Sequence, residues 1–474
     1  MSATRTEADS MGEVAVPAGA LYGPQTARAV ANFPISGWRM PSRFIAALGM
    51  IKRAAAAVHK GAGRLEPAVA DAIMAAAQEV ADGRLDEHFP VDVFQTGSGT
   101  STNMNANEVI ARRATQILCG AAGAGGASGG AAGAPAVHPN DHVNMGQSSN
   151  DVIPTALHVA AAIAIRRELL GALEQLRAAL ADKAAELDDV VKIGRTHLMD
   201  AVPVRLGQEL AGHASQVAGA AELLAVAVDR LCELPLGGTA VGTGLNAPPD
   251  FATSVCRILA ALCSLPFREA ADHFAASGSR DAALLASAAL RSAGLAMGKV
   301  ASDIRLLGSG PRCGLGELLL PAVQPGSSIM PGKVNPVICE AVIQVACQVV
   351  GNDAAIAAGA TGGVGSILEL NVAMPLIAAN LLCSISLLTG AAKVLADKCI
   401  RGLAADRARC EQLVERSLAM VTALAPRIGY DRAAEIAKEA HRTGRTVREI
   451  CRQRNVLPPA ELDALLDARV QTGE

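Results

Sequence analysis

A glycine-bearing loop near residue 330 combines residue types that could remove a proton from carbon. It reads Gly-Ser-Ser-Ile-Met-Pro-Gly-Lys-Val-Asn-Pro over residues 326–336. A lysine cation (Lys333), an amide (Asn335) and the partial positive charge of a helix N-terminus would converge at one point. That combination suits a dicarboxylate. It suits even better the enediolate-like dianion that forms when a proton leaves the carbon beside a carboxylate.

The residues after this loop predict a helix. Asn335 is expected as its N-cap and Pro336 as its first residue, with Glu340 one turn in and Gly351 at its end. The Gly-Lys pair also resembles a nucleotide phosphate loop. That motif needs glycine at position 327 and Ser or Thr at 334, and the sequence has neither, so we set the nucleotide interpretation aside.

Two more polar stretches lead into predicted helices, at residues 96–103 and 138–151. The first, Thr-Gly-Ser-Gly-Thr-Ser-Thr-Asn, carries hydroxyls and amides on a backbone that glycine lets approach a ligand. The second runs from His-Pro-Asn-Asp-His to Gln-Ser-Ser-Asn-Asp, with Pro154 expected just inside the next helix, in its first turn. Each stretch could be no more than a turn or an N-cap. Several uncharged donors at a helix N-terminus nevertheless also make an anion site.

Two histidine-containing patterns each allow a functional and a structural interpretation. His138 and His142 have the spacing of metal ligands, but the intervening Pro139 and the lack of a third soft ligand argue against a metal site. Thr196 and His197 follow a glycine between two predicted long helices. A lone histidine is often structural, yet this pair is a candidate for acid–base chemistry if a carboxylate orients it.

The elements that must position these loops are predicted to be helices. The chain has 474 residues, of which 51% are apolar and only 2% aromatic, so small and straight side chains must fill the core. Leucines recur at helical spacing between residues 169 and 187, and strand signals are scarce. We expect a mainly α protein with an N-terminal domain over 1–146, a central long-helix region over 147–404 and a small helical domain over 405–474.

The composition also limits what the protein could bind and in which cellular compartment it is expected. With 42 Lys and Arg against 45 Asp and Glu, the chain has no basic excess for binding nucleic acid. Residues 370–392 carry no charge, but the asparagines and Pro375 within them favour a buried helix over a membrane span. The eleven scattered cysteines and the polar N-terminus predict a reduced, cytoplasmic protein, or the mature form of a mitochondrial one. The Gly/Ala-rich residues 119–137 are expected to form a flexible surface loop.

At four stretches, residues 96–103, 138–151, 194–197 and 326–336, the sequence closely resembles the fumarase/aspartase superfamily, and within it the iron-independent class II fumarases. The resemblance runs from residue 5 to about 448, and residues 326–335 are its most specific motif. It implies a three-domain, mainly helical fold with a long central bundle. It also implies a homotetramer with active sites shared among three subunits, and no metal or organic cofactor. The implied reaction is the reversible trans hydration of fumarate to L-malate through an aci-carboxylate intermediate.

The resemblance also implies roles for individual residues. Ser327 would be the base that removes the C3 proton of malate, and Lys333 and Asn335 would bind a carboxylate and stabilise the intermediate. His197 would contact the substrate or the reacting water and would accept a hydrogen bond from, or donate one to, Glu340. The other substrate carboxylate and that water would be held by Ser98, Thr100, Ser148, Ser149, Asn150 and Thr196. A secondary anion site would be formed by His138, Asn140 and Asp141.

Two alternatives remain open at this point. Aspartate ammonia-lyase shares residues 326–335 and the trans-elimination chemistry. The stretches 147–150 and 236–240 favour a fumarase, whereas 201–206 and 399–402 look more like an aspartase. An inactive relative that kept the fold would be expected to lack a chemical residue, and all six of the expected ones are present: Thr196, His197, Ser327, Lys333, Asn335 and Glu340.

Overall fold

The computed structural model describes residues 3–121 and 137–473 and is mainly α-helical, as the sequence predicts. Its residues divide into two compact units. One contains residues 1–170, 222–291 and 348–387, and the other contains 171–221, 292–347 and 388–474. The three-domain division stays a prediction. The Gly/Ala-rich stretch expected to be a surface loop lies mostly outside the described residues.

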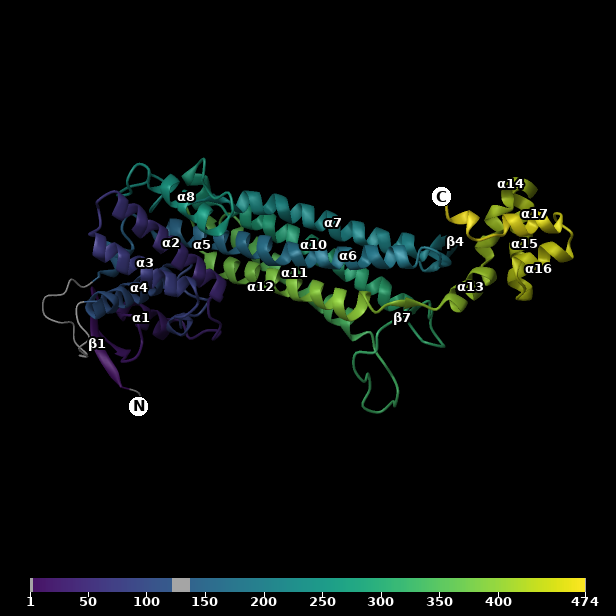
Figure 1. The fold of residues 1–474 in the computed structure, drawn as a ribbon, viewed down its shortest axis with the longest axis horizontal. Helices are drawn as coiled ribbons and strands as arrows, with labels where there is room; N and C mark the ends of the chain where they lie inside the picture. The colour runs from purple at the N-terminus through teal and green to yellow at the C-terminus, as the bar shows by residue number, and fades with distance from the viewer. Residues whose placement is uncertain (1–2, 122–136, 474) are drawn as a thin grey trace. The chain divides into compact units, whose positions relative to one another are not determined.

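In the first unit, the hairpin of β1 (Thr4–Asp9) and β2 (Gly12–Pro17) precedes a cluster of helices (Figure 1). The helices and short strands that lie wholly in this unit are α1 (Pro24–Asn32), α2 (Ser42–Gly61), α3 (Pro67–Ala81), α4 (Thr100–Ala121), α5 (Ser149–Ala164), α8 (Phe251–Cys263), α9 (His273–Gly278), the parallel pair β5 (Glu233–Leu234) and β6 (Arg268–Glu269), and the antiparallel pair β8 (Ser366–Ile367) and β9 (Leu370–Asn371). Three short helical turns also lie in it: η1 (Asp86–His88) and the π-turns η2 (Pro139–Val143) and η3 (Ile165–Leu169).

Small side chains allow these helices to approach closely. A Cβ atom added to Gly49 of α2 would lie 2.6 Å from the backbone nitrogen of Ala81 in α3, so only glycine fits there. The facing residues of α2 and α3 are largely alanine and isoleucine with no exposed surface, such as Ala54 and Ile73. An aromatic-poor core is therefore the consequence of tight helix contacts.

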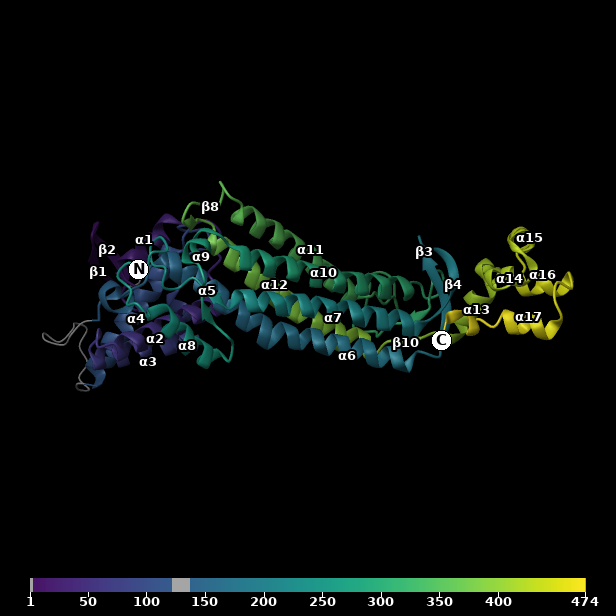
Figure 2. The ribbon, with the colours of Figure 1, turned by 90° about the horizontal axis from the view of Figure 1, so that it is seen from above.

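The second unit holds the hairpin of β3 (Val191–Thr196) and β4 (Met199–Arg205), which Figure 2 shows as a pair. Its other complete elements are β7 (Leu318–Leu319) paired with β10 (Ala404–Ala405), η4 (Ala396–Ile400), α13 (Arg407–Arg416), η5 (Leu418–Ala423), α14 (Ala425–Ile428), α15 (Tyr430–Thr443), α16 (Val447–Gln453), α17 (Pro459–Leu465) and η6 (Val470–Thr472). The small helices after residue 405 share one apolar core, in which Leu424, Ile436 and Ile450 have no exposed surface.

Four long helices contribute residues to both units: α7 (Leu206–Leu231), α10 (Asp281–Leu307), α11 (Val337–Ala360) and α12 (Met374–Leu395). The π-turn η3 (Ile165–Leu169) leads into α6 (Leu170–Glu186), whose predicted leucine stripe is confirmed. Leu173, Leu176 and Leu180 are all fully buried.

Two expectations about helix boundaries were wrong. Helix α11 begins at Val337 and continues through Gly351 to Ala360, because a glycine in a helix interior costs only about 1 kcal/mol and tertiary packing outweighs it. The N-terminal residues of the uncharged run 370–392 form β9 rather than helix, so α12 begins only at Met374.

The same run was expected to be buried on all sides, and it is not within one chain. By length and composition, residues 337–360 and 374–400 could each cross a membrane. Their most apolar 18-residue stretches are only 33% and 56% buried. Helix α11 therefore leaves an uncharged face uncovered in the single chain.

Candidate active site

The loop at 326–335 is closed by its own hydrogen bonds. The Gly326 N–H donates to the carbonyl of Lys333 (2.8 Å), and the Asn335 side-chain amide donates back to the Gly326 carbonyl (2.6 Å). A Cβ at Gly326 would lie 2.7 Å from the Asn335 nitrogen, so glycine is required where the two ends meet. The expectation that Asn335 caps α11 is therefore wrong. Its side chain closes the loop, and the Pro336 carbonyl accepts the first helical bond from Glu340.

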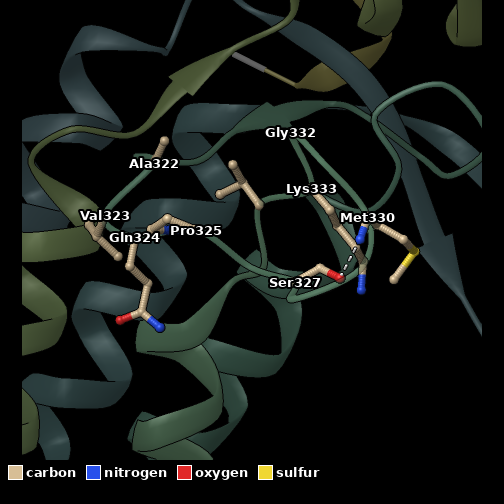
Figure 3. Close-up of a pocket in the computed structure, with 9 residues that line it drawn as sticks. Ala322, Val323, Gln324, Pro325, Ser327, Met330, Gly332 and Lys333 are labelled. Carbon is tan, nitrogen blue, oxygen red and sulfur yellow. Dashed lines mark hydrogen bonds between the residues drawn. The ribbon is translucent and has the colours of Figure 1, made fainter.

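Within this loop, the Ser327 hydroxyl oxygen accepts two backbone hydrogen bonds. The donors are the N–H groups of Ile329 (3.2 Å) and Met330 (2.9 Å), and Figure 3 shows the second of these bonds. N–H donors aimed at an oxygen stabilise negative charge on it more than they stabilise the neutral hydroxyl. The geometry is therefore of the kind that lets a serine act as a base.

Ser327 and Lys333 line one open cavity of about 410 Å³ (Figure 3). Its other lining residues are Ala322, Val323, Gln324, Pro325, Met330, Gly332 and Val334. Lys333 is exposed, and in the part of the chain that the structure describes it forms no salt bridge. Its positive charge is available to an anionic ligand beside the serine.

Thr196 and His197 lie at the tip of the β3–β4 hairpin. Thr196 pairs with Met199, so the turn has two residues, His197 and Leu198. Both have positive φ (56° and 62°), a conformation that fits a type I′ turn but that bulky residues rarely adopt. Strain of this kind is typical of functional positions.

Ion pairs with a buried carboxylate hold strand β3 of this hairpin, from Lys192 near its start to Arg195 next to its tip. Glu317, which has no exposed side-chain surface, accepts two hydrogen bonds from Arg195 (2.7 and 3.1 Å) and lies 3.6 Å from the Lys192 nitrogen. Lys192 also donates to Glu209 (2.9 Å). The exposed tip that carries His197 therefore follows directly after a strand that is held by buried ion pairs. Within the described residues of this one chain, no hydrogen bond links His197 to Glu340, so that pairing stays a prediction for an assembly.

Three of the predicted carboxylate-binding residues of the first unit lie together. The hydroxyl of Thr100, at the start of α4, hydrogen-bonds to those of Ser98 and Ser149, each at 2.8 Å. Ser148 is the N-cap of α5 and shares a capping box with Asp151. The helix therefore begins at Ser149, and Pro154 lies in its interior rather than in its first turn, where it was expected. A row of hydroxyls at two helix N-termini can hold one carboxylate by hydrogen bonds and by the helix dipoles.

The predicted secondary anion site also has a local structure. His138 precedes the π-turn η2, and its Nδ1 atom accepts a hydrogen bond from the backbone N–H of Asp141 (3.0 Å). The backbone N–H of His138 donates to Nδ1 of His142 (3.0 Å). Both imidazoles are thus used to shape this turn, on which His138, Asn140 and Asp141 are exposed. In residues 3–121 and 137–473, no group of three or more His, Cys, Asp or Glu side chains has the arrangement of a metal site.

Comparison with known proteins places this chain in a family. The family model described as lyase matches residues 12–351, and the model of the fumarase C C-terminus matches residues 420–471. The chain is 51% identical to the class II fumarate hydratase of Chromobacterium violaceum over 97% of each chain, and 48% identical to that of Rhizobium meliloti over the full length of both. This chain belongs to the class II fumarate hydratase family.

Solved structures agree with this assignment. A class II fumarase from Schistosoma mansoni superposes with a TM-score of 0.94, at 40% identity and 99% coverage of both chains. A Brucella melitensis protein described as a fumarate lyase and delta crystallin, bound to cobalt, superposes with a TM-score of 0.92 at 42% identity and full coverage. The superfamily resemblance and the fold class predicted from the sequence are both confirmed.

In this member of the family, sequence reasoning assigned no role to two buried charged residues beneath the Ser148–Asn150 segment. Asp151 and Lys52 are both fully buried. Burial raises the pKa of Asp151 to about 6 and lowers that of Lys52 to about 7, and their opposite charges partly offset both shifts. The only sequence signal for Asp151 was its place three residues after an N-cap. Lys52 lies in a helix that also carries Arg43, Arg53 and Lys60, so its sequence position does not distinguish it from a surface residue.

Proposed function

We propose that this protein is a hydro-lyase that catalyses the reversible trans hydration of fumarate to L-malate. The observation that carries this proposal is the match, over almost the whole chain at about half identity, to proteins named class II fumarate hydratase. The aligned residues include the loop with Ser327 and Lys333 as well as the hydroxyl groups predicted to bind the second carboxylate. Malate formation places the reaction in the tricarboxylic acid cycle.

The loop geometry supports a specific chemistry for the dehydration direction. Ser327 would react as the alkoxide, which the two N–H groups on its oxygen would stabilise, and it would become a hydroxyl by taking the C3 proton of malate. The electron pair left on C3 would delocalise into the neighbouring carboxylate and give the aci-carboxylate dianion. Lys333, beside Ser327 in the same cavity, would stabilise that charge together with Asn335. The C2–O bond then breaks, and the departing hydroxide takes up a proton to leave as water.

The other residues of the site would bind and orient the substrate. The hydroxyls of Ser98, Thr100 and Ser149 form a continuous row that suits the second carboxylate. His197 and Thr196, at an exposed hairpin tip, would act at the water or the substrate. His138, Asn140 and Asp141 would form a secondary anion site at the surface.

We also propose that the protein works as a homotetramer whose active sites combine residues from three subunits. Helix α11 has 24 residues, carries charge only at Glu340 and Asp353, and leaves much of its apolar length uncovered in the single chain. Helices α7 and α10 expose large apolar side chains as well, among them Val226 (58%) and Leu295 (54%). Burial of these faces between copies would complete the hydrophobic core. Light scattering during gel filtration should give four times the 48.2 kDa of one chain.

The eleven cysteines are all free thiols in the structure, and seven of them are buried. This supports the proposal that the protein is cytoplasmic, since disulfides are rare in that compartment. A mature mitochondrial protein would have the same thiols. Fractionation of the source cells with markers for each compartment tests this part of the proposal.

One spectrophotometric assay tests the reaction. Purified protein is given L-malate and, separately, L-aspartate, while the ultraviolet absorbance of fumarate is followed. We expect fumarate from malate and none from aspartate. Fumarate from aspartate alone would identify an aspartate ammonia-lyase instead. No fumarate from either substrate would identify an inactive relative.

A further inference from the structure

One buried carboxylate joins the start of α5 to a separate loop. The Oδ1 atom of Asp151 accepts a hydrogen bond from the Ser148 N–H (3.0 Å). Its Oδ2 atom accepts two more, from the N–H groups of Gly237 (3.0 Å) and Thr239 (2.8 Å). Residues 148 and 237–239 lie almost 90 positions apart in the sequence, and this side chain holds them against each other.

The loop at 236–240 is strained and also contacts the predicted carboxylate site. Thr239 has a φ of +56° although it is not glycine, and it is only 5% exposed. The next residue, Ala240, accepts a hydrogen bond at its carbonyl from the side-chain amide of Asn150 (2.8 Å). A strained backbone persists only where its surroundings hold it, and here the Asp151 carboxylate does so.

A buried lysine secures the other side of the same segment. The Lys52 ammonium, on α2, donates to the side-chain oxygens of Asn144 (2.8 Å) and Gln147 (3.0 Å). The Asn144 amide donates in turn to the Gln147 carbonyl (3.1 Å). Lys52 and Asp151 therefore hold the segment that ends in Ser148 from both sides, although neither is exposed to solvent.

We propose that Asp151 is a positioning residue for substrate binding, which fixes Ser148, Ser149 and Asn150 in the geometry that receives one carboxylate of the substrate. It does so by holding the α5 N-terminus and the 236–240 loop together. Thr100 and Ser98 share this geometry, because their hydroxyls are linked to Ser149. This inference rests on the proposed hydration of fumarate, and it assigns a role to a residue that does not itself touch the substrate.

The inference predicts a dependence of substrate affinity on pH. Burial raises the pKa of Asp151 to about 6, and the Lys52 charge opposes that rise. The loop residues 236–240 bring no titratable side chain, and His273 of α9 packs against Gly238 on that loop with its ring nitrogens bonded to Pro235 and Glu269. As pH falls through about 6, a proton on the carboxyl removes part of its capacity to accept three N–H bonds. The KM should therefore rise below this pH.

The test measures KM and kcat for L-malate between pH 5.5 and 8 in the full-length wild type, Asp151→Asn and Asp92→Asn. Asp92 is the matched control, because it is also buried and accepts N–H bonds from Ser36, Gly37 and Phe94. Loss of one charge-assisted hydrogen bond should raise the KM of Asp151→Asn by about 10- to 100-fold at pH 7.5, with a much smaller change in kcat. Its KM should no longer respond to pH near 6, whereas that of Asp92→Asn should follow the wild type.

A second variant keeps the inference testable if Asp151→Asn does not fold. Lys52→Met retains Asp151 and removes the cation that lowers its pKa, so the rise in KM should move to higher pH. A wild-type KM that is constant through pH 6, or an Asp151→Asn enzyme with wild-type KM, would overturn the inference. A wild type that turns over no malate at all would instead refute the proposed function.

Discussion

The charge cluster that Glu317 forms with Lys192 and Arg195 of strand β3 gives a testable prediction for the Glu317→Ala variant. Glu317 has no exposed side-chain surface, and it faces Arg195 (13% exposed) and Lys192 (1% exposed). After the substitution, Lys192 keeps Glu209 and the Ile193 carbonyl, whereas Arg195 loses the one carboxylate that it contacts among the described residues. One largely buried positive charge is then uncompensated. Breaking a buried ion pair in this way costs about 3–5 kcal/mol of unfolding free energy.

The measurement is urea unfolding, followed by helical circular dichroism at one fixed protein concentration. Asp189→Ala is the matched control, because Asp189 also forms a two-pronged ion pair with an arginine, Arg407, but both side chains are more than half exposed. Surface pairs contribute little, so this variant should unfold almost as the wild type does.

A double variant separates the pair from its surroundings. Replacing Glu317 with Leu and Arg195 with Met removes both charges and fills the space with apolar groups. The double variant should lose clearly less unfolding free energy than the sum of the losses in Glu317→Leu and Arg195→Met alone, because neither charge is left without its partner. If Glu317→Ala destabilises the protein no more than Asp189→Ala does, or if the two single effects simply add, the ion-pair reasoning is refuted.

Three further outcomes are expected. Ser327→Ala should lower kcat by about 10²–10⁴-fold without altering the oligomer seen by gel filtration, since only the base is lost; near-normal turnover would remove serine from that role. Gly97→Ala should raise the KM for malate, because the new Cβ would lie 1.8 Å from the Val372 carbonyl oxygen and displace the loop before α4, whereas Gly61→Ala, with open space at its Cβ, should not. For Lys52→Met, the direction of the pH dependence of stability follows from the pKa of Lys52, which burial lowers from 10.5 to about 7 in the wild type. The folded wild type binds fewer protons than the unfolded chain between those values, so its thermal stability relative to the variant should rise from pH 7 to pH 10, and a flat difference would contradict this.

The sequence predicted the helical class and the chemical loops because both depend on local information. The leucine spacing of α6, the capping signal before α5 and the glycines of the loops at 97–99 and 326–332 are patterns of near neighbours. Boundaries that depend on packing were predicted less well. The sequence predicts a helix end at Gly351, but helix α11 continues past it, and Asn335 closes its loop instead of capping α11.

By itself, then, the sequence determined that close-packed helices carry a few donor-rich loops, and which chemistry those loops could perform. Only the tertiary structure decided which distant segments meet. It placed the Ser327 oxygen under two N–H groups, joined Thr100 to Ser149, and put the buried Asp151 between α5 and the 236–240 loop. The physical reason is that hydrogen bonds to a buried charge are set by three-dimensional packing, which residue spacing along the chain does not encode.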